Sequence, residues 1–350
     1  MIRRSLALFV ALAAGSASAA EQVPLYSNLK DWLVACDNMR QCTALSNATE
    51  EDVQKLPTWS LSVSREAGPE GALHVGLFSY NKASGQPLLD GKPLQVKLQP
   101  GKLTEGSVPE VYSIEGSDAQ ALIAELRNGQ RLVLPTEEGE AVTSLSGMSA
   151  ALLLMDSVQG RLGTTTALLR KGNNPASSVP PAPAAPPVPT WQAPKPLSEA
   201  DSKRLLAAVR EAMRSDWQPE MYEDELPEGQ AFALSDREAL VILKTGCGAY
   251  NCNYSLYQAP FDQPQQARQA SIPEIPVFED LPPSGSVEFD PASGELSSFT
   301  LAMGMGGCGF TQRWRYDGKG FTPVHATMLG TCLGLDSSYW PVLWRTAEKR

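Results

Sequence analysis

Six cysteines are the side chains best suited to chemistry in this 350-residue chain. Two lie near the N-terminus and four lie in the last third of the chain: Cys36, Cys42, Cys247, Cys252, Cys308 and Cys332. In an exported protein, an even number of cysteines indicates a disulfide framework. Two neighbouring thiols also support reversible thiol–disulfide exchange, and Cys247 with Cys252 is the pair for that alternative.

Their clustering favours one of the fifteen pairings that six cysteines allow. If the clusters belong to separate domains, Cys36 pairs with Cys42, and the other four favour Cys247–Cys252 and Cys308–Cys332. The redox alternative is the weaker one, because four residues separate Cys247 from Cys252 and the thioredoxin-like spacing is two. A zinc site is not expected, since no histidine lies near a cysteine pair.

No other pattern identifies a catalytic residue, a metal site or a cofactor. The two histidines, His74 and His325, fall in different halves of the chain and within expected strands. The Gly-x-Ser-x-Gly motif of α/β-hydrolases is absent, and the glycine-rich run 304–309 lacks the Lys-Ser/Thr end of a phosphate loop. A hydrolase acting on an envelope polymer stays an alternative, and it would need two carboxylates facing one cleft.

Aromatic residues crowd the C-terminal region and form a candidate ligand-binding face: Trp314, Tyr316, Phe321, Trp340 and Trp344. Trp314 and Tyr316 alternate, so both side chains leave the same face of a strand. Such a face stacks on sugar rings or on apolar peptide. The alternative is that these residues form the core of a small β domain. The preference of aromatic residues for strands favours this alternative.

The first nineteen residues predict a cleavable secretory signal peptide. Arg3 and Arg4 precede an apolar stretch at 6–14, and Ala17-Ser18-Ala19 forms a small-x-small cleavage site. The apolar stretch is too short to span a bilayer, which needs about 20 residues. No other apolar run is long enough, so we expect an exported, periplasmic protein without a transmembrane segment in its mature chain.

Composition restricts the class of partner. The chain has 29 Lys and Arg against 39 Asp and Glu, a net charge of −10, and no run of basic residues. Nucleic acid is therefore not an expected partner. With 42% hydrophobic residues, the chain has enough apolar side chains to build folded cores.

A proline-rich segment divides the chain. Nine of the 22 residues at 175–196 are proline, which favours an extended segment without helix or sheet hydrogen bonds. We therefore expect a linker at 173–197 between an N-terminal domain at 20–172 and a C-terminal domain at 198–350.

Hydrophobic periodicity predicts mainly strands on both sides of that segment. Alternating stretches predict strands at 59–63, 73–77, 94–98, 131–134 and 254–257, and an apolar run predicts a central strand at 239–243. Helices are expected at 118–128, at 148–161 and after Ser198, which resembles an N-cap. The turn 317–320 predicts a hairpin of 310–316 with 321–328. The expected fold class is α+β, two mainly antiparallel β domains with a few helices joined by a Pro-rich linker.

Three stretches resemble domain-of-unknown-function family 1176. They are Asp31-Trp32-Leu33-Val34-Ala35-Cys36-Asp37-Asn38 with Cys42 after it, Met155-Asp156-Ser157-Val158-Gln159-Gly160-Arg161-Leu162-Gly163, and Cys247-Gly248-Ala249-Tyr250-Asn251-Cys252. The resemblance implies an exported protein of a Gram-negative bacterium, and it implies no activity.

The N-terminal half also resembles the invasion-associated locus B family through its early Trp-x-x-x-Cys and the run Ser144-Leu145-Ser146-Gly147-Met148. That resemblance implies a periplasmic, mainly β domain, although the second cysteine pair expected there is absent. Our leading hypothesis is a non-catalytic binding or envelope-associated protein whose partner is an unknown envelope component or protein.

Overall fold

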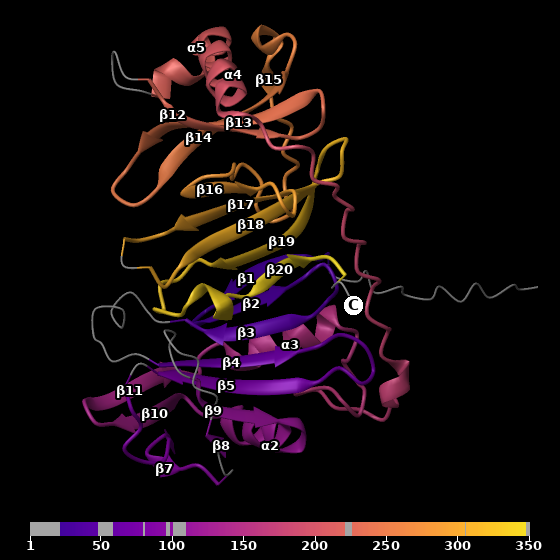
Figure 1. The fold of residues 1–350 in the computed structure, drawn as a ribbon. Helices are drawn as coiled ribbons and strands as arrows, with labels where there is room; N and C mark the ends of the chain where they lie inside the picture. Colours follow the sequence, from indigo (N-terminus) through magenta and orange to yellow (C-terminus); the bar gives the residue numbers. More distant parts are fainter. Residues whose placement is uncertain are drawn as a thin grey trace, which may run out of the picture.

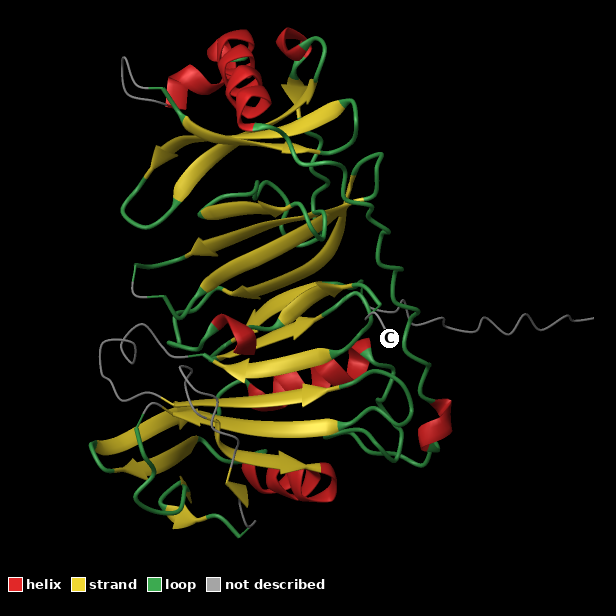
Figure 2. Ribbon diagram, in the orientation of Figure 1, coloured by secondary structure: helices red, strands yellow, loops and turns green. Residues whose placement is uncertain are grey.

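The computed structural model describes residues 22–47, 59–79, 81–95, 99–100, 110–220, 226–304 and 306–347. The predicted signal peptide at 1–19 and residues 96–98 of one predicted strand lie outside these ranges. The described chain forms four antiparallel sheets and few helices, stacked in layers (Figures 1 and 2). Within these ranges, every helix is too short or too polar to cross a membrane.

The N-terminal half is built on a seven-stranded sheet in the order β1-β2-β3-β4-β5-β9-β8. Its strands are β1 (Leu25–Leu29), β2 (Trp32–Cys36), β3 (Cys42–Ser46), β4 (Trp59–Arg65), β5 (Leu73–Ser79), β8 (Gln99–Pro100) and β9 (Glu110–Glu115). Helices α2 (Gly116–Leu126) and α3 (Met148–Val158) share one apolar core with this sheet. A small sheet adds β6 (Leu88–Leu89), β7 (Lys92–Pro93), β10 (Arg131–Thr136) and β11 (Gly139–Ser144).

The C-terminal half stacks two further sheets. The outer sheet contains β12 (Glu228–Ala233), β13 (Glu238–Cys247), β14 (Cys252–Pro260) and β15 (Arg268–Gln269). The inner sheet contains β16 (Ser286–Asp290), β17 (Glu295–Leu301), β18 (Gly309–Tyr316), β19 (Phe321–Leu329) and β20 (Val342–Arg345). Helices α4 (Glu199–Ala212) and α5 (Arg214–Trp217) cover the far face of the outer sheet (Figure 1).

Local signals in the sequence account for several of these elements. The side chain of Ser198 accepts a hydrogen bond from the Asp201 amide and caps α4. The hairpin of β18 and β19 closes with Tyr316 opposite Phe321, as predicted. Helix α3 stops at Val158, earlier than predicted, because Gly160 takes a left-handed φ of 68°.

The two halves pack against each other through apolar side chains. All five residues of β2 are buried, so this strand is covered on both faces. Trp32 and Val34 enter the core under α3. On the opposite face, Leu33 joins a cluster with Leu329 and other residues of the C-terminal half. The strand therefore lies in the middle of the stack.

Residues 173–197 lie against this stack and are not a free spacer. Trp191 packs edge-on to Tyr316 with ring centroids 5.8 Å apart, and its Nε1 donates to the Pro291 carbonyl at 3.0 Å. The Pro186 carbonyl accepts from the Ala347 amide at 2.8 Å. The domain boundaries at 172 and 198 stay a prediction.

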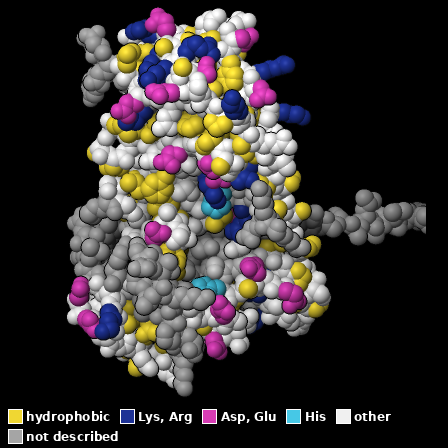
Figure 3. Space-filling model, in the orientation of Figure 1, with side chains coloured by type: hydrophobic (Ala, Val, Ile, Leu, Met, Phe, Trp, Pro, Cys, Tyr) yellow, Lys and Arg dark blue, Asp and Glu magenta, His cyan; other side chains and the backbone are white. Residues whose placement is uncertain are grey.

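The three disulfides have the favoured pairing. Cys36–Cys42 and Cys247–Cys252 each join residues that face one another at the end of a hairpin. Cys308–Cys332 joins the segments that flank β18 and β19. No cysteine is free. On the face shown in Figure 3, acidic and basic side chains are intermixed over the α4 end of the molecule.

Candidate ligand-binding cleft

The predicted aromatic face is not an exposed surface. Trp314, Tyr316, Phe321 and Trp340 are 1%, 2%, 4% and 3% exposed. The reason is the layered fold, because the inner sheet has a sheet on each side and its aromatic side chains fill both interfaces. Trp344 is half-buried, and its Nε1 donates to the Pro323 carbonyl at 3.2 Å. Their burial agrees with the favoured alternative, the core of a β domain, and not with an open aromatic surface.

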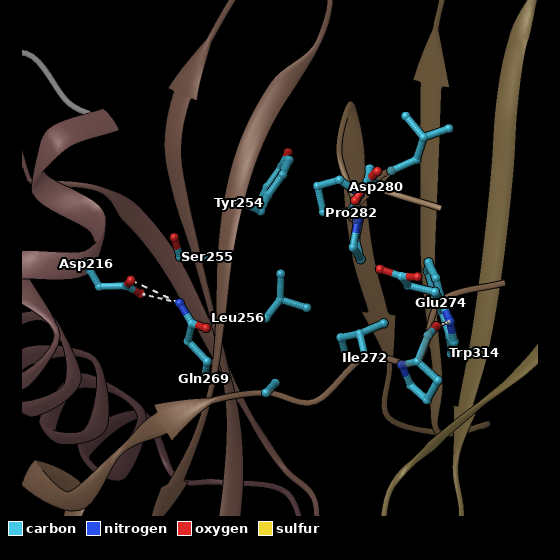
Figure 4. Close-up of a pocket in the computed structure, with 14 residues that line it drawn as sticks. Asp216, Tyr254, Ser255, Leu256, Gln269, Ile272, Glu274, Asp280, Pro282 and Trp314 are labelled. Carbon is cyan, nitrogen blue, oxygen red and sulfur yellow. Dashed lines mark hydrogen bonds between the residues drawn. The ribbon is translucent and has the colours of Figure 1, made fainter. Parts of the chain in front are cut away.

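Trp314 nevertheless contributes to a cleft between the two C-terminal sheets. The cleft has a volume of about 390 Å³ and lies between β14 and the segment 270–283, which connects β15 to β16 (Figure 4). Tyr254, Ser255, Leu256 and Gln269 line one wall. The other wall is lined by residues of the connecting segment and by Trp314: Ala270, Ile272, Pro273, Glu274, Asp280, Leu281, Pro282, Pro283 and Trp314.

Asp216 fixes the orientation of Gln269 at one end of the cleft. Gln269 Nε2 donates to both carboxylate oxygens of Asp216, at 3.0 and 3.1 Å. The side-chain oxygen of Gln269 is therefore turned away from Asp216, on the side of the cleft (Figure 4). Asp216 also accepts from the Tyr257 hydroxyl at 2.6 Å. Burial, and secondly this hydrogen bond, raise the pKa of Tyr257, which keeps it a donor.

The connecting segment 270–283 contributes polar residues to one wall of the cleft, and its apolar residues are buried in the core. Ile275 and Phe278 are fully buried between the sheets. Two non-glycine residues of the segment have a left-handed φ, 70° at Val277 and 63° at Asp280. For a β-branched residue such a φ is strained, and strain of this kind persists where the surroundings fix the backbone.

Two carboxylates of this wall have no partner among the residues that the structure describes. Glu274 and Asp280 are exposed, and the Glu274 carboxylate points into the space between the walls (Figure 4). Within the described residues, neither makes a hydrogen bond or ion pair through its side chain. The Trp314 Nε1, by contrast, is occupied by the Pro273 carbonyl at 2.8 Å.

A second cavity of about 250 Å³ shares one lining residue, Tyr254, with the cleft. Its lining includes Glu228, Lys244 and Glu288. Lys244 forms an ion pair with Glu228 across β12 and β13.

The other residues considered from sequence lie elsewhere. Cys247 and Cys252 close the tip of the β13–β14 hairpin, where Asn251 Nδ2 donates to the Leu301 carbonyl at 2.7 Å. His74 is on β5 and His325 on β19. Burial, and then Arg313 and Arg345, lower the pKa of His325 to about 4. Neither histidine lines the cleft, and no group of three or more potential metal ligands occurs among the described residues.

The motif at 155–163 forms a buried polar network beyond the end of α3. Asp156 Oδ2 accepts from the Leu168 amide at 2.8 Å, and burial raises its pKa to about 6. Arg161 is fully buried and donates to Gln159 at 2.9 Å, to Thr166 and to carbonyls of the loop 66–68. The network joins loops and borders neither the cleft nor the second cavity, which indicates a structural role.

Sequence reasoning missed the residues that border the cleft: Asp216, Tyr254, Gln269, Glu274 and Asp280. They come from α5, β14, β15 and the connecting segment, so no short motif contains them. The run Pro273-Glu274-Ile275-Pro276-Val277-Phe278-Glu279-Asp280 is the one local signal, because proline and acidic residues next to buried apolar ones indicate an anchored loop.

Comparison with known proteins gives a family without an assigned activity. A family model described as "Protein of unknown function (DUF1176)" matches residues 26–347. The Uncharacterized protein YpfG of Escherichia coli (strain K12) is 29% identical over 342 residues, which cover 92% of this chain and 93% of that protein. No solved structure matches significantly. Neither match supports the resemblance of the N-terminal half to the invasion-associated locus B family.

Proposed function

This chain belongs to the DUF1176 family of proteins of unknown function, and from that premise we propose that it is an exported, periplasmic binding protein. Its ligand site is the cleft between the two C-terminal sheets. The observation that carries the proposal is the cleft itself, a space of about 390 Å³ bordered by aromatic, aliphatic and oriented polar groups. Small-molecule sites have this size and this mixture of side chains.

Export is supported by two independent features. The N-terminal sequence has the charged start, short apolar stretch and small-residue cleavage site of a signal peptide. All six cysteines form disulfides, which persist in oxidising compartments such as the periplasm. An envelope component is therefore the expected source of the ligand.

Binding fits the cleft better than hydrolysis does. Glu274 and Asp280 border one cavity, which is what a carboxylate-dependent hydrolase needs. The acid of such a pair is kept protonated by apolar surroundings, whereas both of these side chains are exposed. Carboxylates open to water are suited to holding a ligand.

A thermal-shift screen with the mature protein tests the proposal. The panel contains small envelope and periplasmic solutes: amines, amino acids, sugars and short peptides. We expect at least one compound to raise the melting temperature of the wild type, because a ligand that binds only the folded state stabilises it. The Tyr254→Ala variant should lose that stabilisation, since Tyr254 borders the cleft.

Tyr250→Ala is the matched control. Tyr250 is on the same hairpin, is 47% exposed and does not border the cleft. It should keep the response to the compound. A panel that leaves the wild type unchanged, or a compound that stabilises the Tyr254→Ala variant equally, contradicts a binding site in this cleft.

A further inference from the structure

We propose that the ligand is an extended organic polycation, a linear aliphatic amine that lies past Tyr254 in both cavities. This inference rests on the proposed function, since it names the ligand class of the same site. It follows from three features of the cleft: the polar groups that it presents, the charge of its walls and the residue Tyr254, which it shares with the second cavity.

The cleft offers hydrogen-bond acceptors and few donors. Asp216 occupies the amide nitrogen of Gln269, which leaves the side-chain oxygen of Gln269 for a ligand. The indole N–H of Trp314 is occupied by the Pro273 carbonyl. Among the described residues of the walls, the Tyr254 hydroxyl remains as a side-chain donor, since the Ser255 hydroxyl donates to Tyr257. A complementary ligand must itself bring N–H or O–H donors.

The walls of the cleft carry negative charge only. Asp216, Glu274 and Asp280 border it, and no lysine, arginine or histidine among the described residues does. The charge of Asp216 is already engaged by the Tyr257 hydroxyl and by Gln269. Glu274 and Asp280 have no such partner within the described residues, so an ammonium group would supply both the missing charge and the donors.

The second cavity continues the same chemistry beyond Tyr254. Among the described residues that line it, the basic Lys244 is paired with Glu228, which leaves Glu288 as the unpaired charge. Tyr254 lines both cavities and lies opposite Lys244 in the β13–β14 pair, and an aromatic face attracts a cation. We therefore expect the ammonium groups of such a chain to lie at the carboxylates of the cleft and at Glu288 of the second cavity. The methylene groups between them would lie along Tyr254.

Calorimetric titration of the mature protein with spermidine tests the inference, with N-acetylglucosamine as a neutral probe and glutarate as an anionic one. We expect spermidine to bind with a stoichiometry of one and more weakly at high salt. The double variant Glu274→Gln/Asp280→Asn keeps the shape of the walls and removes their charge. It should weaken spermidine binding by about tenfold or more, the loss expected for charge-assisted hydrogen bonds.

A matched double variant excludes general attraction to an acidic protein. Glu138→Gln/Glu140→Gln removes the same charge from the exposed β10–β11 hairpin, and it should bind spermidine as the wild type does. Equal weakening in both double variants, or no spermidine binding, overturns the inference. If N-acetylglucosamine or glutarate binds instead and loses affinity in Tyr254→Ala, the polycation is wrong and the binding cleft stands. If no probe and no panel compound binds, both proposals fail.

Discussion

Asn38 and Arg345, 307 positions apart, are joined by two hydrogen bonds. Asn38 Nδ2 donates to the Arg345 carbonyl at 3.0 Å, and the Arg345 amide donates to Asn38 Oδ1 at 2.9 Å. The Arg345 side chain lies 2.5 Å from the buried carboxylate of Asp37. The small loop closed by the Cys36–Cys42 disulfide is thus attached to β20, the last strand of the chain.

Removing this pair should weaken the contact between the two halves. Asn38→Ala deletes both bonds and leaves backbone groups of Arg345 without partners, so we expect the free energy of unfolding to fall by about 2 kcal/mol. Urea denaturation measures the change. The exposed Asn253 is the matched position, and Asn253→Ala should stay within about 0.5 kcal/mol of the wild type. Equal losses of unfolding free energy in the two variants would contradict a specific contribution of Asn38 to the contact between the two halves.

Gly285 should be intolerant of a side chain. Its amide donates to the Cys252 carbonyl at 2.8 Å, its φ is 82°, and an added Cβ would lie 2.1 Å from the Phe299 carbonyl oxygen. Gly285→Ala should therefore lower the free energy of unfolding by about 3 kcal/mol or more.

A substitution at Gly318 separates the two causes of the loss expected at Gly285, which are the left-handed backbone and the steric clash with Phe299. Its φ of 93° is also left-handed, but an added Cβ would meet nothing within 4 Å. Gly318→Ala should lose about 1 kcal/mol from backbone strain alone. A loss at Gly285 no larger than this would contradict the close approach of β17 to that glycine.

Local signals predicted the β18–β19 hairpin and the cap of α4, and they did not predict the layering of the fold. The turn 317–320 fixed the β18–β19 hairpin, and Ser198 marked the start of α4, because those signals act between near neighbours in sequence. The stacking of sheets depends on which faces are covered. The apolar run of β2 was the available signal, since a strand without alternation is buried on both faces.

The cleft was beyond sequence reasoning for a related reason. Gln269 serves the site only because Asp216 orients its amide, and these residues are 53 positions apart. Trp314 was a candidate for a binding face or for a β core, and it is buried and also forms part of a wall of the cleft. Both facts depend on tertiary contacts that composition and spacing do not contain.

Two buried groups should give opposite pH dependences of stability. The pKa of Asp156 rises to about 6 in the folded protein, so between about pH 4 and 6 the folded state holds a proton that the unfolded chain has released. The free energy of unfolding therefore falls as pH rises through this interval, by about 3 kcal/mol at most. The pKa of His325 falls to about 4, so its contribution rises with pH between about 4 and 6.5.

Urea denaturation at several pH values separates the two groups. The difference in unfolding free energy between Asp156→Asn and the wild type should become more favourable to the variant as pH rises from 4 to 6. The difference for His325→Gln should move the opposite way, from pH 4 to 6.5. A difference that is constant with pH for either variant contradicts the pKa shift assigned to that residue.

The Cys247–Cys252 disulfide should contribute stability and no redox activity. In the chain-entropy model a disulfide closing a short loop stabilises by about 2 kcal/mol, and the Cys308–Cys332 loop should give about 1 kcal/mol more. Cys247→Ser/Cys252→Ser should therefore lose less stability than Cys308→Ser/Cys332→Ser. The wild type should not catalyse insulin reduction by dithiothreitol. Catalysis that disappears in Cys247→Ser/Cys252→Ser would revive the thiol-redox alternative.

The central claim is that the cleft beside Tyr254 binds the ligand, and a crystal structure tests it most directly. Crystals of the mature protein would be soaked in the compound that gives the largest thermal stabilisation. We predict density for the compound between β14 and the segment 270–283, with a donor within hydrogen-bond distance of the Gln269 side-chain oxygen. Density for the compound at another surface, with only solvent in the cleft, would contradict the claim.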